Sequence, residues 1–235
     1  VQNTNSYNVL EKYRVKTNYS ISGDTRFDRV LEISRLEFQN QYIASFCKDR
    51  PTWVAGSTWP DDEKIITEAF DTNIELGLII APHEMDEAHL EKIENQFRNS
   101  IRLSKITFDT DLSSKKVLLI DGFGMLSSLY RFGNFAYVGG GFNKAGIHNI
   151  LEAAVYGIPV IWGPNHQRAF EAQELMETGG GISIQDSRSL QEWLVKLQSN
   201  KEFYSDMCSA SREYVLNKKG ATEKIYLQTV NTSTD

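Results

Sequence analysis

Short apolar runs, separated by segments with helical character, constrain the fold of this chain more than any other feature. The runs that suit buried strands are TWVAG (52–56), LGLIIA (76–81), KVLLID (116–121), FAYVGG (135–140), PVIWG (159–163) and GISIQ (181–185). Runs this short and this apolar are typical of strands covered on both faces. Because helical segments alternate with them over short connections, the sequence predicts a doubly wound parallel β-sheet flanked by helices.

One domain is expected over residues 26–217. Apolar residues recur at helical spacing from Phe27 to Phe46, and Pro60 followed by three acidic residues suits a helix start. The other expected helices lie at 86–100, in GMLSSLYRFG (124–133), at 148–156 and 167–178, as a pair over 187–217, and from Thr222. Residues 1–25 form a polar leader that ends in a turn, and residues 218–235 form a terminal helix or tail.

The charge and the cysteine content argue against several classes of protein. The chain has 235 residues and a net charge of −6 without a long Lys/Arg run, which argues against a nucleic-acid partner. Cys47 and Cys208 belong to no CxxC pair, so neither a disulfide scaffold nor a zinc site is expected, and a reducing compartment is favoured. No apolar stretch reaches membrane-spanning length, so we expect the isolated chain to be soluble.

The segment from Tyr137 to Pro164, YVGGGFNKAGIHNILEAAVYGIPVIWGP, carries the strongest functional signal. Its glycines allow a sharp turn after a strand and a close approach of a ligand to the backbone. A helix that begins near His148 would direct its free N–H groups at a phosphate, and Glu152 in the first turn could accept both hydroxyls of a ribose. The segment predicts a nucleotide site at the end of a parallel strand, and the alternative is an ordinary βαβ unit with a tight turn.

The other strand ends add candidates, because the carboxyl ends of parallel strands meet on one rim. Ser57 and Thr58 suit either an anion or the cap of the helix that begins at Pro60. His83 suits a phosphate partner or a loop histidine, and Phe123 suits a base-stacking surface or the core. Asn149 suits a helix cap or a phosphate contact.

Glu152 is the sharpest of these candidates, because a carboxylate on an otherwise apolar helix is costly to bury without donors. Ribose hydroxyls or the backbone N–H groups of its own helix would supply them. His89 and His166 are weaker candidates, and His89 is expected to be solvated on a charged helix. The sequence holds no HExxH pattern, no Ser-His-Asp order and no dinucleotide fingerprint.

The motifs together resemble those of the 3-deoxy-D-manno-octulosonic acid (Kdo) transferases. The resemblance rests on AGSTWPDDE (55–63), IIAPHE (79–84), DGFGML (121–126), the segment 137–164 and GGGISI (179–184). It implies a Rossmann-like domain, the carboxyl-terminal half of a two-domain GT-B glycosyltransferase that moves Kdo from CMP-Kdo to a lipid A precursor in lipopolysaccharide synthesis. That reaction takes place at the cytoplasmic face of the bacterial inner membrane. The amino-terminal half, with the acceptor groove and the catalytic carboxylate, is expected to be absent from this chain, which alone is expected to be inactive.

The resemblance also implies the residues that contact the donor. They are Ser57, Thr58, His83, Gly122, Phe123, Gly124, Gly140, Gly141, His148, Asn149 and Glu152. Ser57 and Thr58 would line the phosphate side of the cleft, Gly122 to Gly124 would border the cytosine, and Glu152 would hold the ribose. The remaining glycines, with His148 and Asn149, would hold the phosphate, and Arg26 is a further candidate to reach the cleft.

The chain departs from the family pattern at two places. Many relatives have an Arg-His pair where this chain has Pro82-His83, so His83 is only a partial replacement for the expected cation. The family run GGHNPLE is GIHNILE here, so Ile147 replaces a permissive glycine. Because the donor has a single phosphate, no metal and no cofactor are expected.

Two other functions remain open at this point. The first is another GT-B enzyme, either a UDP-sugar transferase or a sugar epimerase, which a second basic residue at the strand ends would favour. The second is a non-catalytic nucleotide-binding module on the same fold. A phosphatase or a dehydrogenase is disfavoured by the lack of a nucleophile or a dinucleotide motif.

Overall fold

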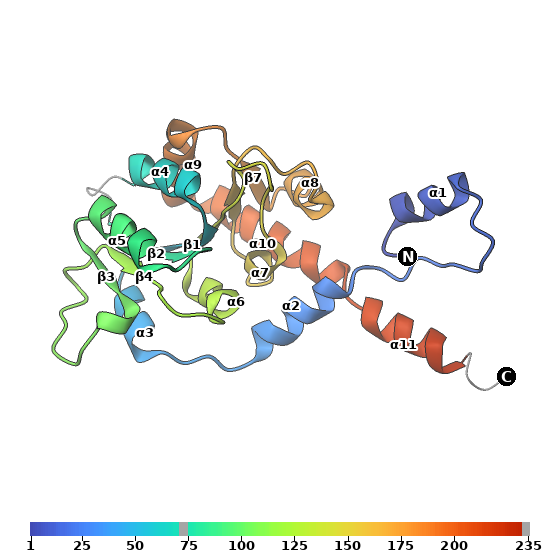
Figure 1. The fold of residues 1–235 in the computed structure, drawn as a ribbon, viewed down its shortest axis with the longest axis horizontal. Coiled ribbons are helices and arrows are strands. Elements are labelled where there is room, and N and C mark those ends of the chain that lie inside the picture. The colour runs from blue at the N-terminus through green and yellow to red at the C-terminus, as the bar shows by residue number, and fades with distance from the viewer. Residues whose placement is uncertain (71–74, 232–235) are drawn as a thin grey trace.

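The computed structural model describes residues 1–70 and 75–231, and a parallel sheet lies at its centre (Figure 1). The strands are β1 (Thr52–Thr58), β2 (Gly77–Pro82), β3 (Ser100–Arg102), β4 (Val117–Leu119), β5 (Phe135–Val138), β6 (Val160–Trp162) and β7 (Gly181–Ser183). Their order in the sheet is β3-β4-β2-β1-β5-β6-β7, and every neighbouring pair is parallel. The predicted doubly wound parallel sheet is therefore confirmed.

Helices cover both faces of the sheet and enclose two apolar cores (Figure 1). One face is covered by α2 (Thr25–Arg35), α3 (Gln41–Cys47), α6 (Leu126–Leu129), α7 (Leu151–Ala154), α8 (Phe170–Glu177) and α10 (Lys201–Asn217). The other is covered by α4 (Pro60–Ala69), α5 (Glu87–Gln96) and α9 (Ser187–Ser199). Along β1, Trp53 and Ala55 enter one core and Val54 enters the other, as the twofold period of a strand requires.

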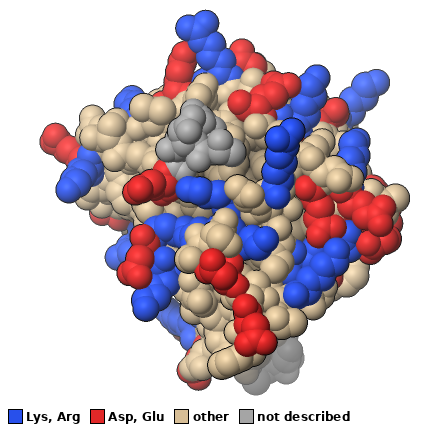
Figure 2. All heavy atoms as spheres, turned by 90° about the vertical axis from the view of Figure 1, so that its left-hand side faces the viewer, with Lys and Arg blue, Asp and Glu red and all other residues tan. Residues whose placement is uncertain are grey.

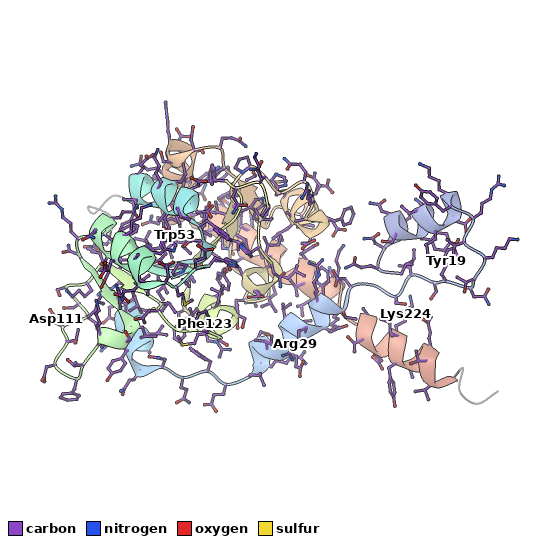
Figure 3. All side chains as sticks on the ribbon, in the orientation of Figure 1. Tyr19, Arg29, Trp53, Asp111, Phe123 and Lys224 are labelled. Carbon is purple, nitrogen blue, oxygen red and sulfur yellow. The ribbon has the colours of Figure 1, made fainter. Side chains whose placement is uncertain are left out.

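The two ends of the chain project from the same end of the body, where α1 (Thr4–Lys12) and α11 (Ala221–Asn231) lie away from the sheet (Figure 1). Asp28 of α2 accepts the backbone N–H groups of Gly220 and Thr222 at 2.6 and 2.8 Å and so holds the start of α11. Lys224, labelled in Figure 3, donates to the backbone oxygen of Ile21. No helix in residues 1–70 or 75–231 combines the length and the apolar character needed to cross a membrane.

Four elements differ from the sequence-based expectation. The helical run from Phe27 to Phe46 is broken, because the Asn40 side chain accepts the N–H groups of Tyr42 and Ile43 and starts a second helix there. The short edge strand β3 and the helix α1 were not expected at all. The helix expected over 148–156 is the four-residue helix α7, with Glu152 in its first turn.

The order in which strands are added to the sheet reverses between β1 and β5, although the two strands are parallel. The chain adds β2 on one side of β1 and later returns to add β5 on the other side. Ligands of open α/β sheets bind outside the strand ends at such a switch point. A Cβ at Gly139, directly after β5, would lie 2.2 Å from the backbone oxygen of Ser57, so the two strand ends are in contact there.

Charges of both signs are interleaved on the left-hand face of Figure 1, which Figure 2 shows front-on. This face includes the sheet edge at β3 together with α3 and α5. Lys and Arg alternate with Asp and Glu across it, without a large area of one sign. The net negative charge of the chain is therefore not concentrated on this edge of the sheet.

Replacing Gly139 with alanine should separate the ends of β1 and β5. The new methyl group would meet backbone atoms of Ser57 that cannot move aside without shifting the strand. We expect a loss of about 2 to 3 kcal/mol in the free energy of unfolding, measured by urea denaturation. Gly122→Ala is the matched control, because its nearest neighbour is the flexible end of Met125 at 3.0 Å. Equal stability of the two variants would contradict the close contact.

Candidate functional site

A buried carboxylate, Asp62 in the first turn of α4, connects the two strand ends at the switch point. One of its oxygens accepts the backbone N–H groups of Gly140 at 2.8 Å and Trp59 at 3.0 Å. The other accepts the hydroxyl of Tyr137 at 2.7 Å. Burial raises the pKa of Asp62, while these three donors act in the opposite direction. Asp62 therefore fixes the loop after β1 against the glycine turn after β5.

Three aromatic rings are stacked above this junction. The rings of Trp59 and His83 have centroids 4.5 Å apart, and those of His83 and His148 are also 4.5 Å apart. The indole N–H of Trp59 donates to Nε2 of His148 at 2.9 Å. Burial and the neighbouring His83 lower the pKa of His148. The structure thus brings together two predicted residues, His83 and His148, from the ends of different strands.

The structure corrects the expected roles of Thr58 and His89. Thr58 is fully buried and its hydroxyl donates to Glu63 at 3.1 Å, so it does not face the rim. His89 is buried, not solvated, because one ring nitrogen bonds the other Glu63 oxygen at 2.8 Å and the second bonds the backbone oxygen of Glu84. Burial raises the pKa of Glu63. Through its bonds to Thr58 and His89, Glu63 connects the end of β1 to α5.

The expected phosphate cradle also differs in one respect. Gly140 donates its N–H to Asp62, so this group is not free for a phosphate. A Cβ at Gly141 would lie 2.5 Å from the backbone nitrogen of Gly163, so this glycine permits the contact between the loops after β5 and β6. Contact of Gly141 with a ligand stays a prediction. Since α7 begins only at Leu151, His148 and Asn149 precede the helix and lie in the loop before it.

Glu152 is half-buried, and it forms no ion pair within the described residues. Asn149 accepts the N–H of Leu151, the first residue of α7, at 3.2 Å and donates its amide to one Glu152 oxygen at 3.2 Å. Burial raises the pKa of Glu152. Burial also raises the pKa of Tyr130, and the charge of Glu152 acts in the same direction. The second oxygen of Glu152 has capacity to accept further hydrogen bonds.

A cavity of about 680 Å³ opens beside the glycine turn, between the loops after β5 and β6 and the start of α2. Arg26, Lys144 and Arg168 contribute cations to its wall, so Arg26 does reach the cleft. Arg26 is paired with Asp24 and Glu171, at 2.7 Å each. Lys144 and Arg168 are exposed and have no ion pair in the part of the chain that the structure describes. His148, Asn149 and His166 also line this cavity, which suits an anion.

Phe123 is not a core residue, because 83% of it is exposed. It follows β4 and lies beside α6 (Figure 3). Gly124 has a φ of +80° and turns the chain into α6, while a Cβ at Gly122 would meet only Met125. The apolar face of Phe123 is available for stacking, but the structure does not bring it against the other candidates. Its role toward a base, with Gly122 and Gly124, stays a prediction.

Backbone conformation explains two of the remaining positions. Ser57 has a φ of +52°, which is rare for a residue other than glycine, and its side chain has no hydrogen bond among residues 1–70 and 75–231. Strain of this kind is found mostly at functional sites. In the GIHNILE run, the residue in the left-handed backbone region is Gly146, whose φ is +89°. Ile147 therefore causes no backbone strain, and its side chain packs against the core.

The sequence analysis missed the parts played by Trp59 and Asp62. Both lie in the quoted AGSTWPDDE motif, where the tryptophan received no role and the acids were assigned to a helix start. It also missed the cations Lys144 and Arg168, which follow the exits of β5 and β6. Lys144 lies inside the quoted segment 137–164, where the predicted site residues are the glycines, His148, Asn149 and Glu152, and Arg168 lies beyond that segment.

No protein-family model matches the chain. Two 3-deoxy-D-manno-octulosonic acid transferases are similar in sequence. That of Aquifex aeolicus is 36% identical over 155 residues, which are 63% of this chain and 42% of the relative. That of Haemophilus influenzae is 25% identical over 223 residues, 89% of this chain and 51% of the relative. The chain thus spans about half the length of these curated relatives.

Solved structures share the fold. The C-terminal CMP-Kdo binding domain of WaaA from Acinetobacter baumannii has a TM-score of 0.62 at 19% identity, and the match covers 82% of this chain and 99% of that domain. A putative UDP-N-acetylglucosamine 2-epimerase from Listeria monocytogenes has a TM-score of 0.67 at 15% identity, with 100% of this chain and 58% of that protein covered. At these identities the similarity establishes the architecture alone.

Replacing Asp62 with alanine should leave three buried donors without an acceptor. We expect the free energy of unfolding, measured by urea denaturation, to fall by about 3 kcal/mol. Asp62→Asn should cost less, because its amide oxygen can still accept the N–H groups of Trp59 and Gly140. Asp61→Ala, at the exposed neighbouring position, is the control and should change little. An Asp62→Ala variant as stable as this control would show that the junction does not depend on the carboxylate.

Proposed function

We propose that this chain, which is related in sequence to Kdo transferases and in fold to a C-terminal CMP-Kdo binding domain, is the donor-binding part of a Kdo transferase. The resemblance predicted from its motifs is confirmed by that relation. The enzyme would be a glycosyltransferase that uses CMP-Kdo as the donor. The lipid A precursor as acceptor and a peripheral position at the inner membrane belong to the same proposal.

The observation that carries this proposal is the unpaired carboxylate of Glu152 beside a cationic cavity at the switch point. Glu152 and the cavity are linked by Asn149, which bonds the first and lines the second. A nucleoside monophosphate has two hydroxyls for a carboxylate acceptor and an anionic group for the cations. Glu152 and the cavity thus offer partners for both kinds of polar group that a cytidylate carries.

In the reaction we propose, the oxygen of the acceptor hydroxyl forms a bond to the anomeric carbon of Kdo. The bond from that carbon to the phosphate oxygen breaks, and CMP leaves with the electron pair. Lys144, Arg168 and His148 would stabilise the charge that develops on the phosphate, and they are in place before the reaction begins. The acceptor proton would pass to a base supplied by a part of the enzyme outside these 235 residues.

A UDP-sugar enzyme is the second candidate, and one observation favours it. A second basic residue near the strand ends would favour such an enzyme, and the structure brings Lys144 and Arg168 into the same cavity. Two unpaired cations could hold a diphosphate. The decisive comparison is therefore between nucleotides that differ in base and in phosphate number.

Calorimetry on the chain should give weak binding of CMP, weaker binding of UMP, and at least tenfold weaker binding of UDP. The proposed reason is that the site fits a cytosine and a single phosphate. No turnover is expected from this chain alone. Equal affinity for CMP and UDP would contradict the proposal and favour the UDP-sugar enzyme, and no binding of any nucleotide would contradict both.

Glu152→Gln should lower the affinity for CMP about tenfold, because a neutral amide accepts ribose hydroxyls less strongly than a carboxylate does. CMP that lacks both ribose hydroxyls should bind the wild type and Glu152→Gln equally weakly. If the losses of affinity from Glu152→Gln and from removal of the ribose hydroxyls were additive, Glu152 would not hold the ribose.

The affinity should also depend on pH through the same residue. Burial raises the pKa of Glu152, and its ionised form accepts ribose hydroxyls more strongly than its protonated form does. Binding of CMP to the wild type should therefore weaken as the pH falls through this raised pKa. Glu152→Gln should keep the pH dependence of the phosphate and of the cavity histidines His148 and His166 but lose the part that comes from Glu152. Identical pH profiles for the two proteins would remove Glu152 from the site.

A further inference from the structure

The hydrogen bond between Trp59 and His148 determines which nitrogen of the histidine carries the proton. Nε1 of Trp59 lies 2.9 Å from Nε2 of His148. An indole N–H can only donate, so Nε2 of His148 must accept. A neutral imidazole that accepts at Nε2 carries its proton on Nδ1. The bond therefore selects the Nδ1–H form of His148.

Both partners of this hydrogen bond are held in place through the backbone. The N–H of Trp59 donates to Asp62, and the N–H of His148 donates to the backbone oxygen of Gly139 at 3.0 Å. The two rings are within 10° of parallel, and His83 stacks against each of them. The Trp59–His148 hydrogen bond thus joins two residues that the backbone holds independently at the junction between β1 and β5.

The opposite edge of the His148 ring is directed elsewhere. Cδ2, which is bonded to Nε2, faces the turn at Gly140, at 3.1 Å from the position of a Cβ there, so the edge formed by Nδ1 and Cε1 lies on the other side of the ring. Nδ1 has no hydrogen-bond partner in residues 1–70 and 75–231, and it is not among the buried polar atoms that lack one. Because His148 lines the cationic cavity and its Nδ1 is not a fully buried atom, an Nδ1–H would be a free donor for a ligand in that cavity.

We infer that Trp59 is a positioning residue that fixes His148 as a neutral N–H donor for an anionic oxygen of the bound nucleotide. The inference rests on the proposed function for the identity of the ligand. A proton on Nε2 would destroy the bond from Trp59, so His148 contributes a directed hydrogen bond and no charge. The cations of the cavity supply the positive charge, and the N–H of His148 determines the position of the anionic oxygen that accepts from it.

The tautomer can be measured without any nucleotide. Long-range ¹H–¹⁵N spectra of the labelled chain should show the Nδ1–H form for His148 in the wild type. Trp59→Phe keeps a ring against His83 but removes the N–H, so it should give a mixture of both tautomers or the Nε2–H form. Trp193→Phe, at a tryptophan stacked on Phe203 in another part of the molecule, is the control and should leave His148 unchanged. An Nε2–H form in the wild type would overturn the inference whatever the chain binds.

The role toward the ligand is tested by CMP calorimetry on the same variants. Trp59→Phe should bind CMP about fivefold more weakly, as loss of one well-oriented neutral hydrogen bond implies. His148→Ala should cause a similar loss, and the double variant should lose little more. Full CMP affinity in Trp59→Phe, with the tautomer changed, would overturn the inference but leave the proposed function intact. Absence of CMP binding in the wild type would instead contradict the proposed function, and the spectra would still decide the tautomer.

Discussion

The candidate site depends on the buried carboxylate of Asp62. Burial of a carboxylate is unfavourable, and here three donors from Trp59, Tyr137 and Gly140 offset that cost. Each donor belongs to a different part of the switch point: the loop after β1, strand β5 and the glycine turn after it. The same interaction therefore stabilises the junction and sets the positions of Trp59 and, through the glycine turn, of His148.

Neighbouring acidic residues have different roles because their partners differ. Asp62 and Glu63 face inward and use their oxygens on protein donors, so they support the loops. Glu171 is paired with Arg26 at the edge of the cavity. Glu152 alone among these four has no cation or buried network and only one amide donor, from Asn149. Its half-buried position leaves it as the acceptor that a ligand with hydroxyls would meet.

The strands other than β3, their common direction and the residues at their ends could be predicted from the sequence. Apolar runs such as LGLIIA have few alternatives to a buried strand, and parallel pairing then places their exits on one rim. Hydrogen-bond pairing within the rim could not be predicted. Nothing in the order of residues shows that Gly140 donates to Asp62, that Glu63 accepts from Thr58, or that His89 is buried. Such pairings depend on the distance between loops, which the fold alone determines.

These pairings change the physical account of how the site would attract an anion. The sequence suggested backbone N–H groups at a helix start, yet α7 has four residues and the N–H of Gly140 is already used. The attraction therefore falls to side chains, chiefly the exposed Lys144 and Arg168. At 0.1 M ionic strength the attraction of exposed cations is largely screened beyond about 10 Å, whereas a fixed hydrogen bond from His148 acts at contact and is not screened. The cations would thus draw an anion into the cavity, and the Trp59–His148 pair would determine where its oxygen comes to rest.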